Sequence, residues 1–500
     1  MLFNSLEFVL GFLPITLFVF LLIGRFGFHK TAIVWLVAAS FFFYGWWNVS
    51  YVGLLLLSLI FNYLVGVSLT HSHAMLQANR KLLLAFGVTV NLGILGYFKY
   101  LEFFGYTVNH LLGTSFNIED IALPLAISFY TFQQIAYLVD AYRGETKEYN
   151  FAQYILFVLF FPQLIAGPIV HHKEVLPQFS QPKTYQFNWE NMMVGLTIFS
   201  MGLFKKLIIA DEAALYSNQI FNAVSQGTSP TWFEAWSAAL HYTFQLYFDF
   251  SGYSDMALGL ALMFNLRFPL NFNSPYKAVN IIDFWRRWHI TLSRFLRDYL
   301  YIPLGGNRHG KLRRYLNLML TMLLGGLWHG AGWTFIVWGG LHGIYLVMNH
   351  QWHSFRRSLG HDLRNSSWWG QWLGRMLTFI AVVVAWVVFR SENMDVALKM
   401  LASMAGFNGL SGGMAGGGKS LLFLLLIVVW WMPNTQEWLQ QYRPSLEQLT
   451  GIEQAENNRW WQKLQWRPNI FFGTVTGLMI FLCLQQMFAA PSSEFLYFNF

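Results

Sequence analysis

Two groups of residues in this sequence could do chemistry, and the first centres on one histidine. His329 lies inside an apolar run, between Trp328 and Gly330, and the pair Gly325–Gly326 precedes it. Placing a polar imidazole ring in such an apolar run costs free energy. Glycines beside the histidine allow a substrate or another helix to approach closely. A neutral imidazole near pH 7 can accept a proton from a hydroxyl group. His329 is therefore a candidate general base, and the alternative is a core histidine that hydrogen-bonds across helices.

His289 and His342 are further candidates of the same kind. His289 follows Trp288 in a stretch rich in Trp, Phe and Arg, where a polar residue in helix packing is the favoured alternative. His342 lies between Leu341 and Gly343 in another apolar run. An ionisable side chain within a membrane segment is a functional candidate by default.

The sequence predicts no bound metal or cofactor. Four more histidines lie in polar connections, where most histidines are solvated surface residues: His71, His73, His171 and His172. No cysteine or carboxylate stands at a spacing that would complete a metal site around them. The single cysteine, Cys483, lies in an apolar block, which predicts a buried structural thiol and excludes an intrachain disulfide framework.

The second group is strongly basic. From Leu266 to Arg314, ten Lys or Arg stand against two acids. This excess predicts that the segment 266–314 lies on the cytoplasmic side, by the positive-inside rule. Within it, apolar residues recur at helical spacing from Ile281 to Leu300 and predict one amphipathic helix that lies in the membrane interface. Nucleic-acid binding is a poor alternative, because Trp, Phe and Leu are interleaved with the charges.

The polar face of this predicted helix carries Arg286, Arg287 and Arg294, whose guanidinium groups could pair with an anionic donor. Anionic lipid headgroups are the other candidate partners. Asn307, at the end of the turn that follows the helix, and Trp328 are further candidates for contact with a donor.

Two carboxylates lie in an otherwise apolar run, Gln245–Asp255. They are Asp249 and Asp255, and acids in such a place need partners. They could neutralise the Arg-rich helix or fix the tautomer of a histidine. We expect both to form structural ion pairs.

The elements that must position these residues are membrane helices. Hydrophobic residues make up 55% of the chain and charged residues only 11%, whereas soluble proteins carry about 25% charged residues. Several apolar blocks approach the ~20 residues that a helix needs to cross a bilayer, and a helix satisfies its own backbone in lipid. We therefore expect an all-α polytopic protein with one domain, 1–500, and about eleven membrane helices. The blocks are Leu6–Ile23, Ala32–Trp47, Val52–Leu69, Leu82–Phe98, Phe151–Val170, Met376–Phe389, Leu421–Met432 and Ile470–Phe488.

Polar stretches interrupt these blocks. Besides the basic segment, they are Tyr142–Asn191 and Pro433–Asn469, and we expect the stretch 433–469 to form helices at a membrane surface. The first block, Leu6–Ile23, is expected to be a membrane helix rather than a cleaved signal peptide, because no basic region precedes it. Gly413–Ser420 fits the phosphate-loop pattern, but no strand precedes it, so we expect a loop between helices.

Three runs give the sequence a specific resemblance: Gln245–Asp255, Asp283–Arg308 and Gly326–Gly330. They resemble the membrane-bound O-acyltransferase (MBOAT) family, and within it the bacterial branch of alginate O-acetylation components and D-alanine exporters of teichoic acids. Shorter matches such as Leu95–Tyr100 and Leu123–Tyr130 extend the likeness over essentially the whole chain.

The resemblance implies a fold of many helices around a thinned core that a tunnel crosses. It places the family's signature histidine at His329 and the family's second histidine, on the cytoplasmic side of the tunnel, at His289. It also implies transfer of an acyl group, most naturally acetyl from acetyl-CoA, toward an extracytoplasmic polysaccharide such as alginate or cellulose. The transfer would be direct or through a partner protein, in a bacterial inner membrane whose lipids surround the chain.

A secondary transporter or flippase of an acylated carrier, without chemistry of its own, is the alternative. Transporters commonly have paired interrupted helices in two related halves. No such symmetry is visible in the sequence, which favours the enzyme.

Overall fold

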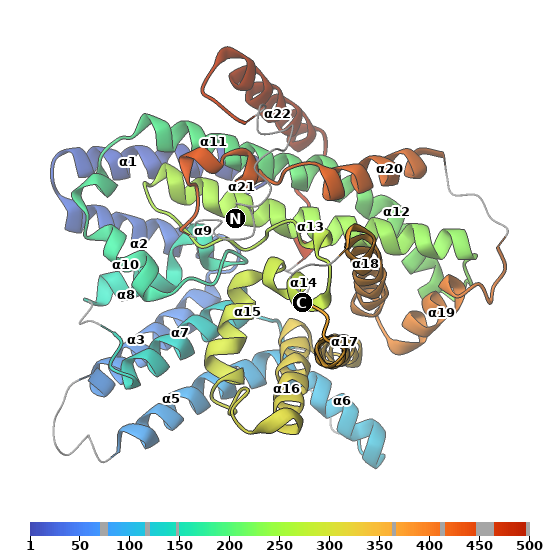
Figure 1. Cartoon of the computed structure of the whole chain (residues 1–500). Coiled ribbons are helices and arrows are strands. Elements are labelled where there is room, and N and C mark those ends of the chain that lie inside the picture. Colours follow the sequence, from blue (N-terminus) through green and yellow to red (C-terminus); the bar gives the residue numbers. More distant parts are fainter. Residues whose placement is uncertain are drawn as a thin grey trace.

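A computed structural model describes residues 1–70, 79–115, 121–146, 150–362, 367–410, 416–446 and 465–496. These residues form helices, turns and irregular connections, with no strand among them, which confirms the predicted all-α class. Figure 1 shows the helices crossing one another in a broad bundle. The longer helices are α1 (Leu13–Arg25), α2 (His29–Gly45), α3 (Ser50–Thr70), α5 (Arg80–Leu95), α6 (Leu101–Leu112), α7 (Ile127–Tyr142), α11 (Trp189–Phe204), α12 (Asp211–Ser225), α13 (Trp232–Met263), α16 (Gly310–His329), α17 (Trp333–Ser358), α18 (Trp368–Arg390), α19 (Met394–Met404), α20 (Gly416–Trp431) and α22 (Ile470–Ala489).

Among the described helices, six continuous stretches are long and apolar enough to cross a membrane. The chain is therefore a multi-pass membrane protein, while the count of about eleven spans remains a prediction. Two of these stretches each consist of two helices that a short π-helical segment joins. The six are Glu7–Arg25, Ser50–Thr70, Arg80–Leu112, Trp189–Ser225, Trp368–Arg390 and Ile470–Ala489.

Helix α13 is the central element of the fold (Figure 1). Its residues from His241 to Met263 are buried on every side, as expected for a helix inside a large bundle. Helix α11 packs directly against it through glycines. A Cβ atom added at Gly252 would lie 2.8 Å from the carbonyl oxygen of Gly202, so the two backbones touch.

The block Phe151–Val170 does not form one membrane helix, contrary to expectation. It contains α8 (Phe151–Leu159) and the short α9 (Phe161–Leu164), all largely buried within the protein. The helix breaks at Phe160, whose ψ is 115°, two residues before Pro162. Proline has no backbone N–H and cannot continue a helix. Apolarity alone does not distinguish a buried broken segment from a span.

The single amphipathic helix predicted from Ile281 to Leu300 is also wrong. The structure has two short helices there, α14 (Ile281–Arg287) and α15 (Ile290–Leu296), with His289 between them at φ 44°. Backbone hydrogen bonds hold this break. The N–H of Ile290 donates to the carbonyl of Asn271, at 3.0 Å, and a second bond reaches the carbonyl of Arg287 from Asn273.

Several other expectations fall partly outside the described residues. His71, His73 and part of the stretch 433–469 lie there, and the described part of that stretch has a short helix, α21 (Thr435–Trp438). Within the predicted loop Gly413–Ser420, the residues from Gly416 onward already belong to α20. Cys483 is a buried thiol in α22, as predicted.

Candidate active site

His329 is the last residue of α16, at the tip of a hairpin that α16 forms with α17. The side chain is only 6% exposed. Glycines bring the two helices together, since a Cβ atom at Gly326 would lie 3.2 Å from the Cα of Gly339 and would clash with the carbonyl of Phe335. The glycines beside His329 therefore serve close helix packing, one of the two roles that the sequence suggested.

A lysine binds the end of α16 directly behind His329. The Nζ atom of Lys99 donates to the carbonyl of Trp328 at 2.6 Å and to that of His329 at 3.3 Å, and it also contacts Ser128 Oγ at 3.3 Å. The hydroxyl of Tyr100 donates to the carbonyl of Leu327 at 2.9 Å. These donors satisfy carbonyls that have no partner within the helix, and the positive charge faces the negative end of the helix dipole.

Sequence reasoning gave Lys99 no role in the site. The signal was available, because a lysine that follows a long apolar block is unusual and marks a functional or structural site. The partner could not be read from the sequence.

Two tryptophans connect the three candidate histidines. The Trp328 ring lies between His289 and His329, with centroid distances of 6.3 Å and 4.9 Å. The Trp338 ring lies between His329 and His342, at 5.1 Å and 4.9 Å. The structure therefore brings His289, His329 and His342 into one buried region.

Hydrogen bonds fix the orientation of His289. Its Nδ1 lies 3.0 Å from Oδ1 of Asn271, and the hydroxyl of Thr291 donates to the same oxygen at 2.9 Å. Because an amide oxygen only accepts, His289 carries its proton on Nδ1, and Nε2 is the basic nitrogen of the neutral ring. Asn271 is a second residue that sequence reasoning missed.

His342 has the opposite arrangement. The indole N–H of Trp285 donates to its Nδ1 at 3.3 Å, so the proton of the neutral ring lies on Nε2. His342 is fully buried in α17.

A small cavity of about 80 Å³ reaches His329 from one side. Lys99, Ser128 and Trp328 line it together with residues of the connection before α7 and with Trp47. A hydroxyl-bearing group that entered this cavity would lie beside His329. The ring could then act as a base toward that hydroxyl.

The arginines predicted to bind a donor have different environments. Arg287 pairs with Asp283 at 2.9 Å, and Arg294 forms a two-pronged pair with Glu174 at 2.6 and 3.0 Å. Arg286 is exposed. The three do not share one polar face, because the helix breaks at His289. Asn307 accepts a hydrogen bond from Tyr301 at the surface. Donor binding by Arg286, Arg287, Arg294, Asn307 and Trp328 remains a prediction.

Asp249 and Asp255 form structural ion pairs, as expected, but with other partners. Lys206 Nζ lies 2.8 Å from Asp249 and Lys205 Nζ lies 2.6 Å from Asp255. Neither bond involves the Arg-rich segment or a histidine. The lysines lie in the π-helical stretch Lys205–Ala210, which α13 contacts directly.

The expectation of a solvated surface histidine is wrong for His172, which is 1% exposed. Its Nε2 lies 3.1 Å from Asp140, and the hydroxyl of Tyr299 donates to the same carboxylate at 2.9 Å. His171 is partly buried and lies 3.5 Å from Asp140. These contacts join α7 to the basic segment.

A multi-pass helical membrane protein with a buried His329 agrees with the helical fold that the resemblance implied, and the tunnel across its core stays a prediction. The chain matches the membrane-bound O-acyltransferase family over residues 32–388, and it belongs to this family. The matched region contains the three candidate histidines, His289, His329 and His342.

Similarity to several named acyltransferases supports the assignment to this family. The chain is 46% identical to the peptidoglycan O-acetyltransferase of Helicobacter pylori, over 82% of this chain and 81% of the relative. It is 42% identical to a probable alginate O-acetylase, AlgI, of Pseudomonas aeruginosa, over 81% and 75%. A teichoic acid D-alanyltransferase of Streptococcus thermophilus is 27% identical, over 53% and 68%. The protein is an O-acyltransferase, and the alternative of a transporter without chemistry is not supported.

We predict that Lys99→Met lowers the rate of acyl transfer by about 10- to 100-fold, because small displacements of a catalytic group cost rates of that order. The carbonyls at the end of α16 would lose their donor, and the position of His329 would relax. Turnover of the purified protein in lipid measures the effect, with thermal unfolding as a check of folding. Lys81→Met on the exposed face of α5 is the matched control. A folded Lys99→Met protein with the wild-type rate would contradict the positioning role.

Proposed function

We propose that this protein transfers an acetyl group from acetyl-CoA on the cytoplasmic side to hydroxyl groups of an extracytoplasmic polysaccharide, within a bacterial inner membrane. The observation that carries the proposal is the buried His329, which lines a cavity at the end of α16 opposite to the charged residues at its start. The names of the relatives support acetyl as the group and a cell-surface polymer such as alginate or peptidoglycan as the acceptor. Cellulose would also be a compatible acceptor, and so would a protein that relays the acetyl group.

The geometry of α16 supports transfer across the membrane. The helix begins at Gly310, within the basic segment, and its twentieth and last residue is His329. A helix of this length rises about 30 Å, so the cavity beside His329 lies far from the charged residues at the start of α16. If the basic segment faces the cytoplasm, the cavity beside His329 lies toward the opposite face, where an exported polymer would be.

The reaction is an attack of the acceptor hydroxyl on the thioester carbonyl. The new ester C–O bond forms while the C–S bond breaks, and the hydroxyl proton passes to His329 and then to the leaving thiolate. His289 would assist through its basic Nε2, and Trp328 between the two rings would limit where the thioester can lie. Arg286, the exposed member of the three arginines, is the best placed for an anionic donor.

We predict that His329→Ala and His329→Gln both abolish acetylation while the protein remains inserted and stable. General-base catalysis contributes about 10²- to 10⁴-fold, so the loss should be at least that large. Gln keeps hydrogen-bonding capacity but cannot accept the proton. The acetyl content of the exported polymer, normalised to membrane protein level, measures the effect, and His110→Gln on the exposed face of α6 is the control.

A structural histidine would give a different result. His329→Gln would then be near wild type, and His329→Ala would be low in abundance. Near-normal acetylation in His329→Gln would defeat the general-base assignment.

We predict that a cysteine at Lys311 is labelled by a membrane-impermeant reagent only after spheroplasts are permeabilised. Lys311 is exposed at the start of α16, within the basic segment. A cysteine at Val49, which is 76% exposed in the turn beside Trp47 and the cavity, should be labelled in intact spheroplasts. Both variants are made in a Cys483→Ser background. The reverse labelling pattern would overturn the proposed orientation.

A further inference from the structure

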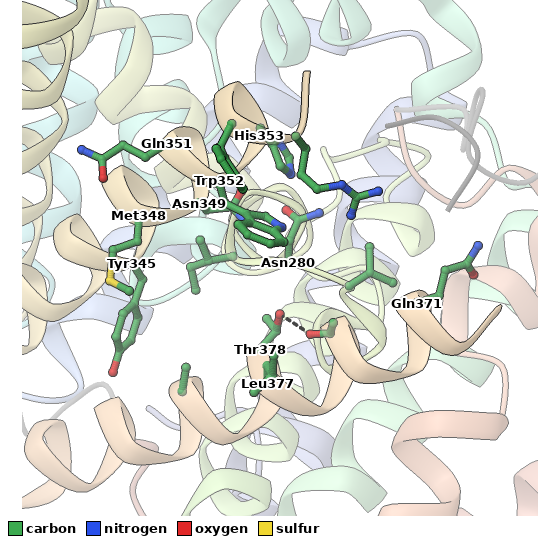
Figure 2. A pocket seen from close by; sticks show the side chains of 17 residues that line it. Asn280, Tyr345, Met348, Asn349, Gln351, Trp352, His353, Gln371, Leu377 and Thr378 are labelled. Carbon is green, nitrogen blue, oxygen red and sulfur yellow. Dashed lines mark hydrogen bonds between the residues drawn. The ribbon is translucent and has the colours of Figure 1, made fainter. Parts of the chain in front are cut away.

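A second cavity, which none of the three candidate histidines lines, lies between α17, α18 and the start of α14 (Figure 2). Its volume is about 750 Å³, within the ~300–1,000 Å³ typical of sites for small molecules. It opens to the outer surface, since three of its lining residues, Met348, Trp352 and Leu377, are 60%, 53% and 60% exposed. None of His329, His289 and Lys99 lines it. The proposed reaction therefore gives this cavity no role.

The α17 wall of the cavity changes from apolar to basic along one helix face. Met348, Trp352 and Arg356 line the cavity at intervals of four residues, and Ile344 extends the same face. The first apolar member, Ile344, is also exposed, at 46%. From Ile344 to Arg356 the helix rises about 18 Å, which is close to the ~15 Å depth of one leaflet's hydrocarbon region.

The α18 wall changes in the same way. Gln371 lies near the beginning of α18, and Leu377 and Ala381 follow farther along the lining. In Figure 2, Gln371 lies at one end of the cavity and Tyr345 and Met348 lie at the other. The cavity thus has a polar end and an apolar end, and the apolar end is open to lipid.

Positive charge gathers at the polar end. Arg356 and His353 line the cavity, and no Asp or Glu is among the lining residues that the structure describes. Arg356 donates a hydrogen bond to Nδ1 of His361 at 2.8 Å and forms no ion pair with any described carboxylate. The neighbouring His350 is within electrostatic range of Arg286, Arg314 and Arg357. A phosphate group would find complementary charge there.

One buried hydrogen-bond acceptor beside the cavity has no donor among the described residues. The Oδ1 atom of Asn349 is buried and has no hydrogen-bond partner among the described residues. Buried polar atoms are nearly always paired, so this oxygen is a place where a ligand hydroxyl could add a hydrogen bond. A hydroxyl of a polar headgroup could supply the donor.

We propose that this cavity binds an anionic phospholipid such as phosphatidylglycerol. The phosphate would pair with Arg356, a headgroup hydroxyl would donate to Asn349, and acyl chains would follow Met348 and Leu377 toward the bilayer. Basic pockets between membrane helices bind anionic headgroups in this way. The nucleotide part of a soluble donor also carries phosphates, but it has no apolar chain for the lipid-facing end of the cavity.

The bound lipid would brace α17 against α18. Helix α17 carries Trp338, whose ring contacts His329 at a centroid distance of 5.1 Å. The lipid would therefore stabilise one wall of the active site from outside, without contact with the reacting groups.

The test uses the full-length protein, purified in mild detergent and stripped of lipid. Phosphatidylglycerol or phosphatidylethanolamine is added, and bound lipid is counted by native mass spectrometry. We expect phosphatidylglycerol to bind at least fivefold more tightly than phosphatidylethanolamine. Arg356→Gln should weaken its binding at least fivefold, which is the order expected for one basic residue near a headgroup. Arg25→Gln, at the exposed end of α1, should leave binding unchanged.

Leu377→Trp, which fills the apolar end, should also reduce binding of phosphatidylglycerol, and thermal unfolding checks that each variant is folded. Equal binding of the two lipids, or wild-type binding in both folded variants, overturns the proposal. Displacement of the lipid by adenosine 3′,5′-diphosphate also overturns it, because the cavity would then belong to the donor. These readouts need no acetyl transfer, so they are independent of the proposed function.

Discussion

The structure depends on one constraint, which is that backbone groups inside a membrane must find partners within the protein. Helix α16 ends at a buried position and leaves its last carbonyls without helical partners. Lys99 and Tyr100 donate to three of them in succession, those of Leu327, Trp328 and His329. These bonds pair the carbonyls at the place where the chain turns inside the protein and returns as α17. The position of His329 therefore depends on a lysine 230 positions earlier in the sequence.

The same constraint explains the break at His289. The N–H of Trp288 still donates to the carbonyl of Phe284, and the chain leaves the helical path at His289, where φ is 44°. Asn271 compensates, because its backbone carbonyl accepts from Ile290 and its side chain binds the His289 ring and Thr291. One residue thus pairs the interrupted backbone and selects the tautomer of the imidazole. The irregular backbone and the orientation of a candidate catalytic ring have a common cause.

The class of protein and the candidate base could be predicted from the sequence, because both depend on local properties. Long apolar blocks identify membrane helices, and an imidazole among glycines in such a block is visible without a structure. The partners could not be predicted. Lys99 binds a carbonyl 229 positions away, and Arg294 binds a carboxylate 120 positions away. Charge counts predicted an excess of cations in the basic segment, but only the fold shows that three of its arginines, Arg287, Arg294 and Arg297, have carboxylate partners.

The wrong prediction of one continuous helix through His289 also has a physical explanation. The apolar residues from Ile281 to Leu300 keep helical spacing across a place where the backbone takes φ 44°. The helical spacing of the apolar residues continues because α14 and α15 each bury one face. The spacing therefore does not reveal the break between the two helices. Irregular backbone at membrane depth is tolerated only where protein or a water-filled cavity surrounds it. Both His289 and His329 lie at such interruptions, and the regular helices on either side supply the rigid support that each ring needs. A histidine at a helix break inside a membrane is thus a stronger candidate than one within a continuous helix, which ranks His329 and His289 above His342.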